Sequence, residues 1–142
     1  MDYFNDYIFK LVIQDNVCED NPYPYSIHGL WPDYSNGSYP QYCNNMDGCS
    51  HNINTCHFNV SEYINSTIIN LMDKIWCSYN HLENPEFWCH EWCKHGTCTD
   101  LGISDYFSKT INLFTENIQN KKYDLINCYV EYLDKTFIEV KC

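Results

Sequence analysis

The residues best suited to acid–base chemistry gather in one short segment, residues 87–98, which reads Phe-Trp-Cys-His-Glu-Trp-Cys-Lys-His-Gly-Thr-Cys. On a helix, a rotation of about 100° per residue places four of its polar side chains on one arc of about 140°. These are His90, Glu91, Lys94 and His95. An imidazole with an ordinary pKa of about 6.5 can take or give a proton near neutral pH. The lysine and a second imidazole can hold anionic phosphoryl oxygens, so this face suits phosphodiester chemistry without a metal.

This segment has two alternative interpretations. The polar residues could form a solvated helix face with charge pairs four residues apart. A zinc site could instead use Cys89, Cys93 and Cys98 together with the two histidines. However, Cys89 and Cys93 do not have Cys-x-x-Cys spacing, and all ten cysteines of the chain can pair with one another. We therefore expect no metal and no cofactor.

A second informative segment, residues 26–33, reads Ser-Ile-His-Gly-Leu-Trp-Pro-Asp. In a regular strand His28 points away from Ile27 and to the same side as Leu30. Gly29 has no side chain, which lets another group approach the backbone closely. The tryptophan that follows could be a core residue or a flat surface on which a base stacks.

Two histidines from separate segments suit a reaction that takes a proton from one oxygen and gives a proton to another. His28 from a strand and His95 from a helix could flank one phosphate. RNA fits this arrangement best because its 2′-hydroxyl is a built-in nucleophile. Attack by that oxygen gives a cyclic phosphate and requires no covalent enzyme intermediate.

Hydrophobic patterns around both segments predict a mixed fold. Strands are predicted over residues 7–14, 25–30, 126–133 and 136–141, with a turn at 134–135. Helices are predicted to begin at Asn59, at Asn84 and near Ser104, and the second helix to end near Gly96. The core-facing residues of the first and third helices are Ile64, Ile68, Leu71 and Ile75, and Phe107, Ile111, Phe114 and Ile118. This order predicts a single α+β domain over residues 1–142, in which an antiparallel sheet packs against helices.

The ten cysteines indicate an oxidising compartment, because cytosolic thiols stay reduced. Glycosylation sequons at Asn36, Asn59 and Asn65 support the same compartment. The first residues lack the basic and apolar regions of a leader, so we expect a mature form of a secreted, extracellular or endolysosomal protein. No apolar run in the sequence is long enough to span a membrane, and we expect a monomer.

The net charge of −11 argues against a protein that holds nucleic acid through a broad basic surface. It is compatible with an enzyme that has one local cationic pocket. Long polyanions should be steered poorly toward such a protein, so the pocket itself must bind the substrate.

The two segments together resemble the ribonuclease T(2) family. Residues 27–32 match the Ile-His-Gly-Leu-Trp-Pro segment of that family completely. Residues 88–98 match its second segment, Trp-x-His-Glu-Trp-x-Lys-His-Gly-Thr-Cys, at every defined position. The resemblance implies a disulfide-rich, ribonuclease T(2)-like α+β fold and an endoribonuclease that cleaves single-stranded RNA to 2′,3′-cyclic phosphate ends.

The resemblance also implies residue roles. His95 corresponds to the general base on the 2′-hydroxyl and His28 to the general acid for the leaving 5′-oxygen. His90 corresponds to a phosphate-binding histidine, and Glu91 and Lys94 to residues that stabilise the pentacovalent state.

A base-binding site and one disulfide are implied in the same way. Trp31 and Asp33 fall where the family holds a base, with Tyr39 on its other side. Cys98 corresponds to the half-cystine that ties the catalytic helix to the loop after the first segment, through Cys43, Cys49 or Cys56.

The chain also departs from the family pattern. The stretch between the third helix and the final strands is nearly absent, and Cys89 and Cys93 occupy variable positions, where we expect extra disulfides. The main alternative function is a secreted effector or immunomodulatory glycoprotein in which ribonuclease activity is secondary or lost.

Overall fold

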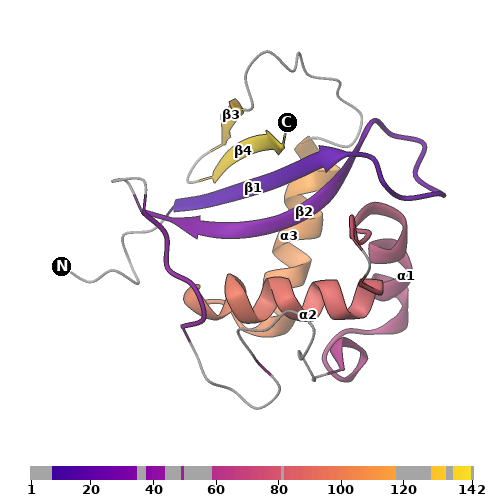
Figure 1. Ribbon diagram of the computed structural model, residues 1–142, viewed down its shortest axis with the longest axis horizontal. Helices are drawn as coiled ribbons and strands as arrows, with labels where there is room; N and C mark the ends of the chain where they lie inside the picture. The colour runs from indigo at the N-terminus through magenta and orange to yellow at the C-terminus, as the bar shows by residue number, and fades with distance from the viewer. Residues whose placement is uncertain are drawn as a thin grey trace.

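The computed structural model describes residues 8–34, 38–43, 49, 59–80, 82–117, 129–133 and 136–141. Its strands and helices are β1 (Ile8–Asp15), β2 (Tyr25–Asp33), α1 (Ser66–Ile75), α2 (Asn84–Lys94), α3 (Ile103–Asn117), β3 (Tyr129–Leu133) and β4 (Thr136–Lys141) (Figure 1). Two 3-10 turns, η2 (Val60–Glu62) and η3 (Gly96–Cys98), precede α1 and follow α2. The expectations for residues 36, 118, 126–128 and 134–135 lie outside the described residues.

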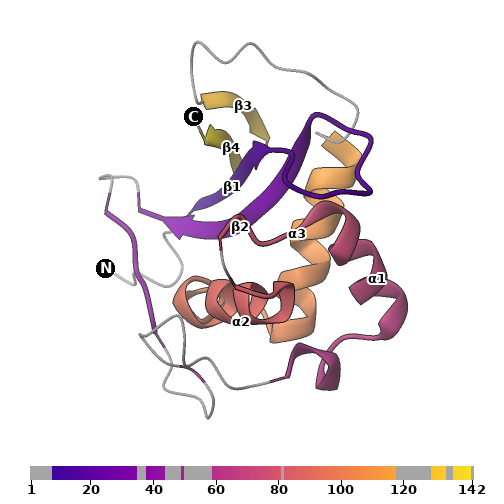
Figure 2. The same cartoon turned by 45° about the vertical axis from the view of Figure 1, so that its right-hand side comes forward.

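The strands form one sheet in the order β2-β1-β4-β3, and the three helices lie on one side of the β1–β2 pair in both views (Figure 1, Figure 2). β1 pairs antiparallel with β2, and β3 pairs antiparallel with β4. The predicted α+β class with an antiparallel sheet is thus confirmed. One parallel pair is added, between β1 and β4. A parallel pair needs a long connection rather than a hairpin, and β2, the helices and β3 all lie between these two strands in the chain.

The core lies between the helices and the β1–β2 pair. Its largest fully buried side chains are Trp76, Trp88, Tyr106, Phe87, Phe107 and Phe114. Of the predicted helix stripes, Ile64, Ile75, Phe107, Ile111 and Phe114 are buried, and Ile68 and Leu71 are partly buried against the same core. Among the described helices, none is long and apolar enough to cross a membrane.

β2 is longer and less regular than the sequence predicted. It continues past Leu30 to Asp33, and Pro32 is tolerated because β2 is an edge strand, where a missing N–H need not break the sheet. A bulge interrupts its pairing with β1: Ile27 faces Ile13 and Gly29 faces Val12, which leaves His28 as the extra residue. The bulge interrupts the regular alternation of sides on which the expected orientation of His28 rests.

One helix start differs from prediction, whereas α2 begins at Asn84 as predicted. The helix expected from Asn59 is only the turn η2, and α1 begins after a second N-cap at Asn65, whose Oδ1 accepts from the N–H of Ile68 at 2.9 Å. At α2 the N-cap position belongs to Glu83. Asn84 instead accepts from the N–H of Ser78, and so its side chain ties the helix to the preceding loop.

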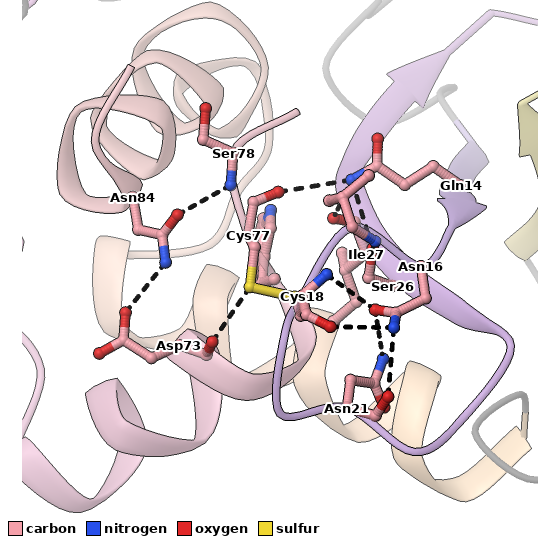
Figure 3. The surroundings of a disulfide bond; sticks show 12 residues. Gln14, Asn16, Cys18, Asn21, Ser26, Ile27, Asp73, Cys77, Ser78 and Asn84 are labelled. Atoms are coloured by element: carbon pink, nitrogen blue, oxygen red, sulfur yellow. Dashed lines mark hydrogen bonds between the residues drawn. A yellow bond between two sulfur atoms is a disulfide. The ribbon is translucent and has the colours of Figure 1, made fainter. Parts of the chain in front are cut away.

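A disulfide between Cys18 and Cys77 fastens the turn between β1 and β2 to the segment after α1 (Figure 3). Beside it the Gln14 side-chain amide points its nitrogen at the carbonyls of Ile27 and Cys77, at 3.3 and 3.4 Å. This cluster therefore anchors the strand residue directly before His28.

Two further disulfides reach the catalytic segment predicted above. Cys98 pairs with Cys43, one of the three partners left open, and Cys93 pairs with Cys49. Cys89 is likewise disulfide-bonded. The extra disulfides expected at the variable positions of the motif are thus present.

Buried side chains hold the outer edge of β2 in place of a further strand. The Trp76 indole donates to the carbonyl of His28 at 2.8 Å, and the Tyr106 hydroxyl on α3 donates to the carbonyl of Leu30 at 2.7 Å. Trp88 on α2 in turn donates to the carbonyl of Trp76 at 2.7 Å. The helices therefore fix the backbone on both sides of Gly29.

Replacing Tyr106→Phe should remove one of these supports without a change in shape. We expect the free energy of unfolding to fall by about 1–3 kcal/mol, because the buried Leu30 carbonyl loses its partner. Urea unfolding with intact disulfides measures this difference. An unchanged midpoint at an unchanged slope would show that the hydroxyl contributes nothing to β2.

Candidate active site

The centre of the site is the carboxylate of Glu91, which α2 presents to the bulge of β2. The residue is buried, at 1% exposed. It approaches the backbone so closely that a Cβ on Gly29 would lie 2.5 Å from Glu91 Oε2 and 2.7 Å from Trp31 Nε1. The close approach predicted at Gly29 is therefore confirmed, and the approaching group is the glutamate of the second motif.

Two imidazoles from the two motifs face this carboxylate. His28 Nε2 lies 3.3 Å from Glu91 Oε1, and His95 Nε2 lies 3.7 Å from Glu91 Oε2. Both histidines are buried, each at 3% exposed. One carboxylate thus directs the same ring nitrogen of both histidines toward one region.

Trp31 completes the surroundings of the carboxylate. Its indole N–H donates to Glu91 Oε2 at 2.9 Å. Its ring stacks on the imidazole of His95, with centroids 4.5 Å apart and planes 14° apart. The tryptophan therefore contacts the acid–base residues directly, in addition to being partly exposed to solvent.

His90 and Lys94 lie on the same helix and are only partly buried. The ring of Tyr42 meets His90 edge-on, with centroids 6.4 Å apart. The backbone of Tyr42 has a left-handed φ of 50°, which is uncommon for a residue other than glycine, and its N–H donates to the carbonyl of Lys94 at 2.9 Å. This contact caps the last turn of α2 beside the site.

The predicted base-binding residues are only partly brought together. Asp33 pairs with Lys10, Oδ2 to Nζ at 3.7 Å, and the same Nζ lies 5.3 Å from the centre of the Trp31 ring. Tyr39 is exposed, and no ring contact among the described residues joins it to Trp31. Lys10 is a site residue that the sequence analysis missed, because nothing in its strand pattern distinguishes it.

Two aromatic residues beside His28 were also missed. Tyr79 lies against the imidazole with centroids 4.8 Å apart, and Phe87 meets it edge-on at 5.5 Å. Tyr79 is half exposed and belongs to the loop between α1 and α2. Only tertiary structure could assign it here, since its neighbours in sequence carry no recognisable motif.

Burial and neighbouring charges determine the protonation states of Glu91, His95 and His90. Burial opposes the charge of Glu91, but a hydrogen bond from His28 and the neighbouring imidazoles lower its pKa to about 2. Burial also disfavours the charged form of His95 and outweighs the attraction of Glu91, so the pKa of His95 falls to about 3. The pKa of His90 is lowered as well, chiefly by burial. The largest contribution that favours the charged carboxylate of Glu91 is the hydrogen bond from His28.

The zinc interpretation does not fit this arrangement. Cys89, Cys93 and Cys98 are all disulfide-bonded and cannot serve as thiolate ligands. Within the described ranges, no cluster of histidine, cysteine and carboxylate side chains has the geometry of a metal site.

The family model of the Ribonuclease T2 family matches residues 7–129. The chain belongs to this family. Ribonuclease DdI of Dictyostelium discoideum is 40% identical over 98 residues, which are 65% of this chain and 37% of that protein. Ribonuclease T2 of Aspergillus oryzae is 36% identical over 103 residues, which are 63% of this chain and 36% of that protein. The chain thus matches little more than a third of the length of these relatives.

Solved structures share the same fold. The crystal structure of Actibind, described as a T2 ribonuclease, is 29% identical with a TM-score of 0.53, covering 77% of this chain and 50% of that chain. A variant of ribonuclease MC1 is 28% identical with a TM-score of 0.50, covering 65% of this chain and 43% of that chain.

Replacing Gly29→Ala should disturb the centre of the site. The new methyl group would meet both the carboxylate of Glu91 and the indole of Trp31, so we expect a loss of about 1–3 kcal/mol in the free energy of unfolding. Gly102→Ala is the matched control, since its methyl group would meet nothing within 4 Å. Equal urea midpoints for the two variants would contradict this account of Gly29.

The lowered pKa values predict that the fold weakens in acid. Below about pH 6.5 the unfolded chain protonates His95 while the folded chain does not, until the pKa of about 3 is reached. The free energy of unfolding should therefore fall as the pH drops through this window. Glu91 adds a second loss between about pH 4.5 and 2, where only the unfolded chain binds its proton.

The variant His95→Phe isolates the first of these effects. It removes the buried titrating group but keeps an aromatic ring against Trp31, so stability should depend less steeply on pH between about 6 and 5. Guanidinium unfolding at a series of pH values measures the slope. The same slope in both proteins would show that His95 does not titrate as inferred.

Proposed function

We propose that this protein is an endoribonuclease that cleaves single-stranded RNA by transphosphorylation and leaves 2′,3′-cyclic phosphate ends, with no metal or other cofactor. The observation that carries the proposal is the pair of imidazoles from two motifs, His28 and His95, whose Nε2 atoms face one buried carboxylate. General acid–base cleavage needs two such groups around one phosphate.

The proposed first step is proton transfer at His95. Its lowered pKa keeps the imidazole neutral over the working pH range, so its unprotonated ring nitrogen can accept the proton of the 2′-hydroxyl. The 2′-oxygen then attacks phosphorus and forms the cyclic bond. As the bond from phosphorus to the 5′-oxygen breaks, His28 in its charged form gives its proton to that oxygen.

The remaining polar residues stabilise the charge that builds on phosphorus. Lys94 and His90 lie partly exposed on α2, where they can contact the phosphoryl oxygens. Glu91 fixes both acid–base imidazoles and offers a negative counterpart to whichever of them carries the proton. Of the predicted base-binding residues, Trp31 and Asp33 are supported by their position beside this cluster, whereas Tyr39 rests on the family resemblance.

The disulfides support a function in the secretory pathway or an endolysosome. The proposed form there is an N-glycosylated monomer. Asn59 and Asn65 are exposed, and each uses its side-chain Oδ1 as an N-cap acceptor. Glycosylation occurs on the amide nitrogen, so a glycan at either residue is compatible with the cap.

Digestion of single-stranded RNA in excess chelator tests the proposed activity. We expect cleavage with 2′,3′-cyclic ends, and a loss of at least about a hundredfold in each of His28→Phe and His95→Phe, because each removes one proton-transfer group. The acidic limb of kcat/KM should lie below about pH 4, since a general base is active above its pKa of about 3.

The variant Glu62→Gln, exposed in the turn η2 and outside both motifs, controls for nonspecific effects of substitution. Near-native rates in either histidine variant would refute the assigned roles, and loss of activity with chelator would refute the metal-free mechanism. Folded, disulfide-intact protein that cleaves no RNA would favour the effector function instead.

A further inference from the structure

We infer that Trp31 is a positioning residue that fixes the carboxylate of Glu91 and the ring of His95, a role separate from any stacking on a base. This inference rests on the proposed ribonuclease function. It assigns Trp31 to the proton-transfer step rather than to substrate binding alone.

The first observation is how the two carboxylate oxygens are shared. Oε1 of Glu91 faces His28, and Oε2 accepts the indole N–H of Trp31 at 2.9 Å. Separate donors on separate oxygens fix the rotation of the carboxylate about its last bond. Because the group is buried, a donor to its charge is worth more than the same contact in water.

The second observation concerns the ring of His95. A histidine is commonly oriented by an acceptor at Nδ1, yet His95 Nδ1 is buried and meets no hydrogen-bond partner among the described residues. Among the described residues, its side-chain polar contact is with Glu91 at Nε2 and its stacked ring contact is with the indole of Trp31. Trp31 therefore supplies the face that sets the plane of the imidazole, while Glu91 sets the direction of Nε2.

A third observation limits the stacking role. The ring of Trp31 is shared with the imidazole of His95 and with the ammonium of Lys10, 5.3 Å from its centre. Trp31 also lies opposite Lys10 in the strand pairing. A base that stacks on this indole must therefore compete with Lys10, whereas the contacts with Glu91 and His95 are made without substrate.

An RNA oligonucleotide with abasic ribonucleotides on both sides of the cleaved bond separates the two roles. No base can then stack on Trp31, so a residue that acts only by stacking gives equal rates in the wild type and the variant. For Trp31→Phe, which keeps a ring but loses the N–H, we expect kcat on this substrate to fall by about tenfold or more. Equal kcat values would overturn the inference.

A pH titration of His95 by NMR provides a readout that needs no catalysis. His95 faces Glu91, Lys94 and His90 of α2 and His28 of β2, and these partners are unchanged in Trp31→Phe. The smaller ring covers less of the imidazole, and the freed Oε2 can turn toward it. The pKa of His95 should therefore rise toward its ordinary value, and an unchanged titration would overturn the inference.

The matched control is Trp88→Phe, which also removes one buried indole hydrogen bond, to the carbonyl of Trp76. It should lower stability but leave the titration of His95 unchanged. A shift in the control as large as in Trp31→Phe would reduce Trp31 to a structural role and overturn the inference. If the wild type cleaves no RNA, the proposed function fails, and the NMR comparison alone still decides the role of Trp31.

Discussion

A charged carboxylate buried between a strand and a helix is the constraint on which the rest of the structure depends. An unpaired charge in a protein interior is strongly destabilising, so Glu91 requires partners on every side. They come from both motifs: His28 and Trp31 from β2, and His95 from α2. Gly29 leaves the space in which these groups meet. The spacing within each motif is therefore also a packing requirement, because it brings all four donors and acceptors to one point.

The surrounding structure restrains the outer edge of β2, which has no strand partner among the described residues to hold its backbone. Among the strands that the structure describes, β2 has a neighbour on one side only. On the other side, indole and hydroxyl donors from Trp76 and Tyr106 take the place of a strand and bind the carbonyls on either side of Gly29. Hydrogen bonds from large buried aromatic residues combine a polar contact with extensive packing. The backbone of His28 is thus held by the hydrophobic core itself.

Features that local sequence patterns encode could be predicted from the sequence. Features that arise only when the elements pack together could not. The strand and helix that carry the two motifs, the fold class and the disulfide from Cys98 all followed from spacing and resemblance. The bulge at His28 could not be predicted, because it depends on the register between β1 and β2 rather than on either strand alone. Lys10 and Tyr79 were missed for a related reason: each reaches the site only through pairing or a loop contact.

The disulfide between Cys43 and Cys98 changes how the chain responds to proteases. It joins a residue shortly after the first motif to the last residue of the second, across a sequence separation of 55 residues. A single cut of the backbone anywhere between these cysteines therefore leaves two fragments that stay covalently joined. The fragment with His28 and the fragment with His95 cannot diffuse apart, so a nicked molecule retains both halves of the site. In a compartment rich in proteases, this disulfide keeps the two histidines in one molecule even after the backbone between the cysteines has been cut.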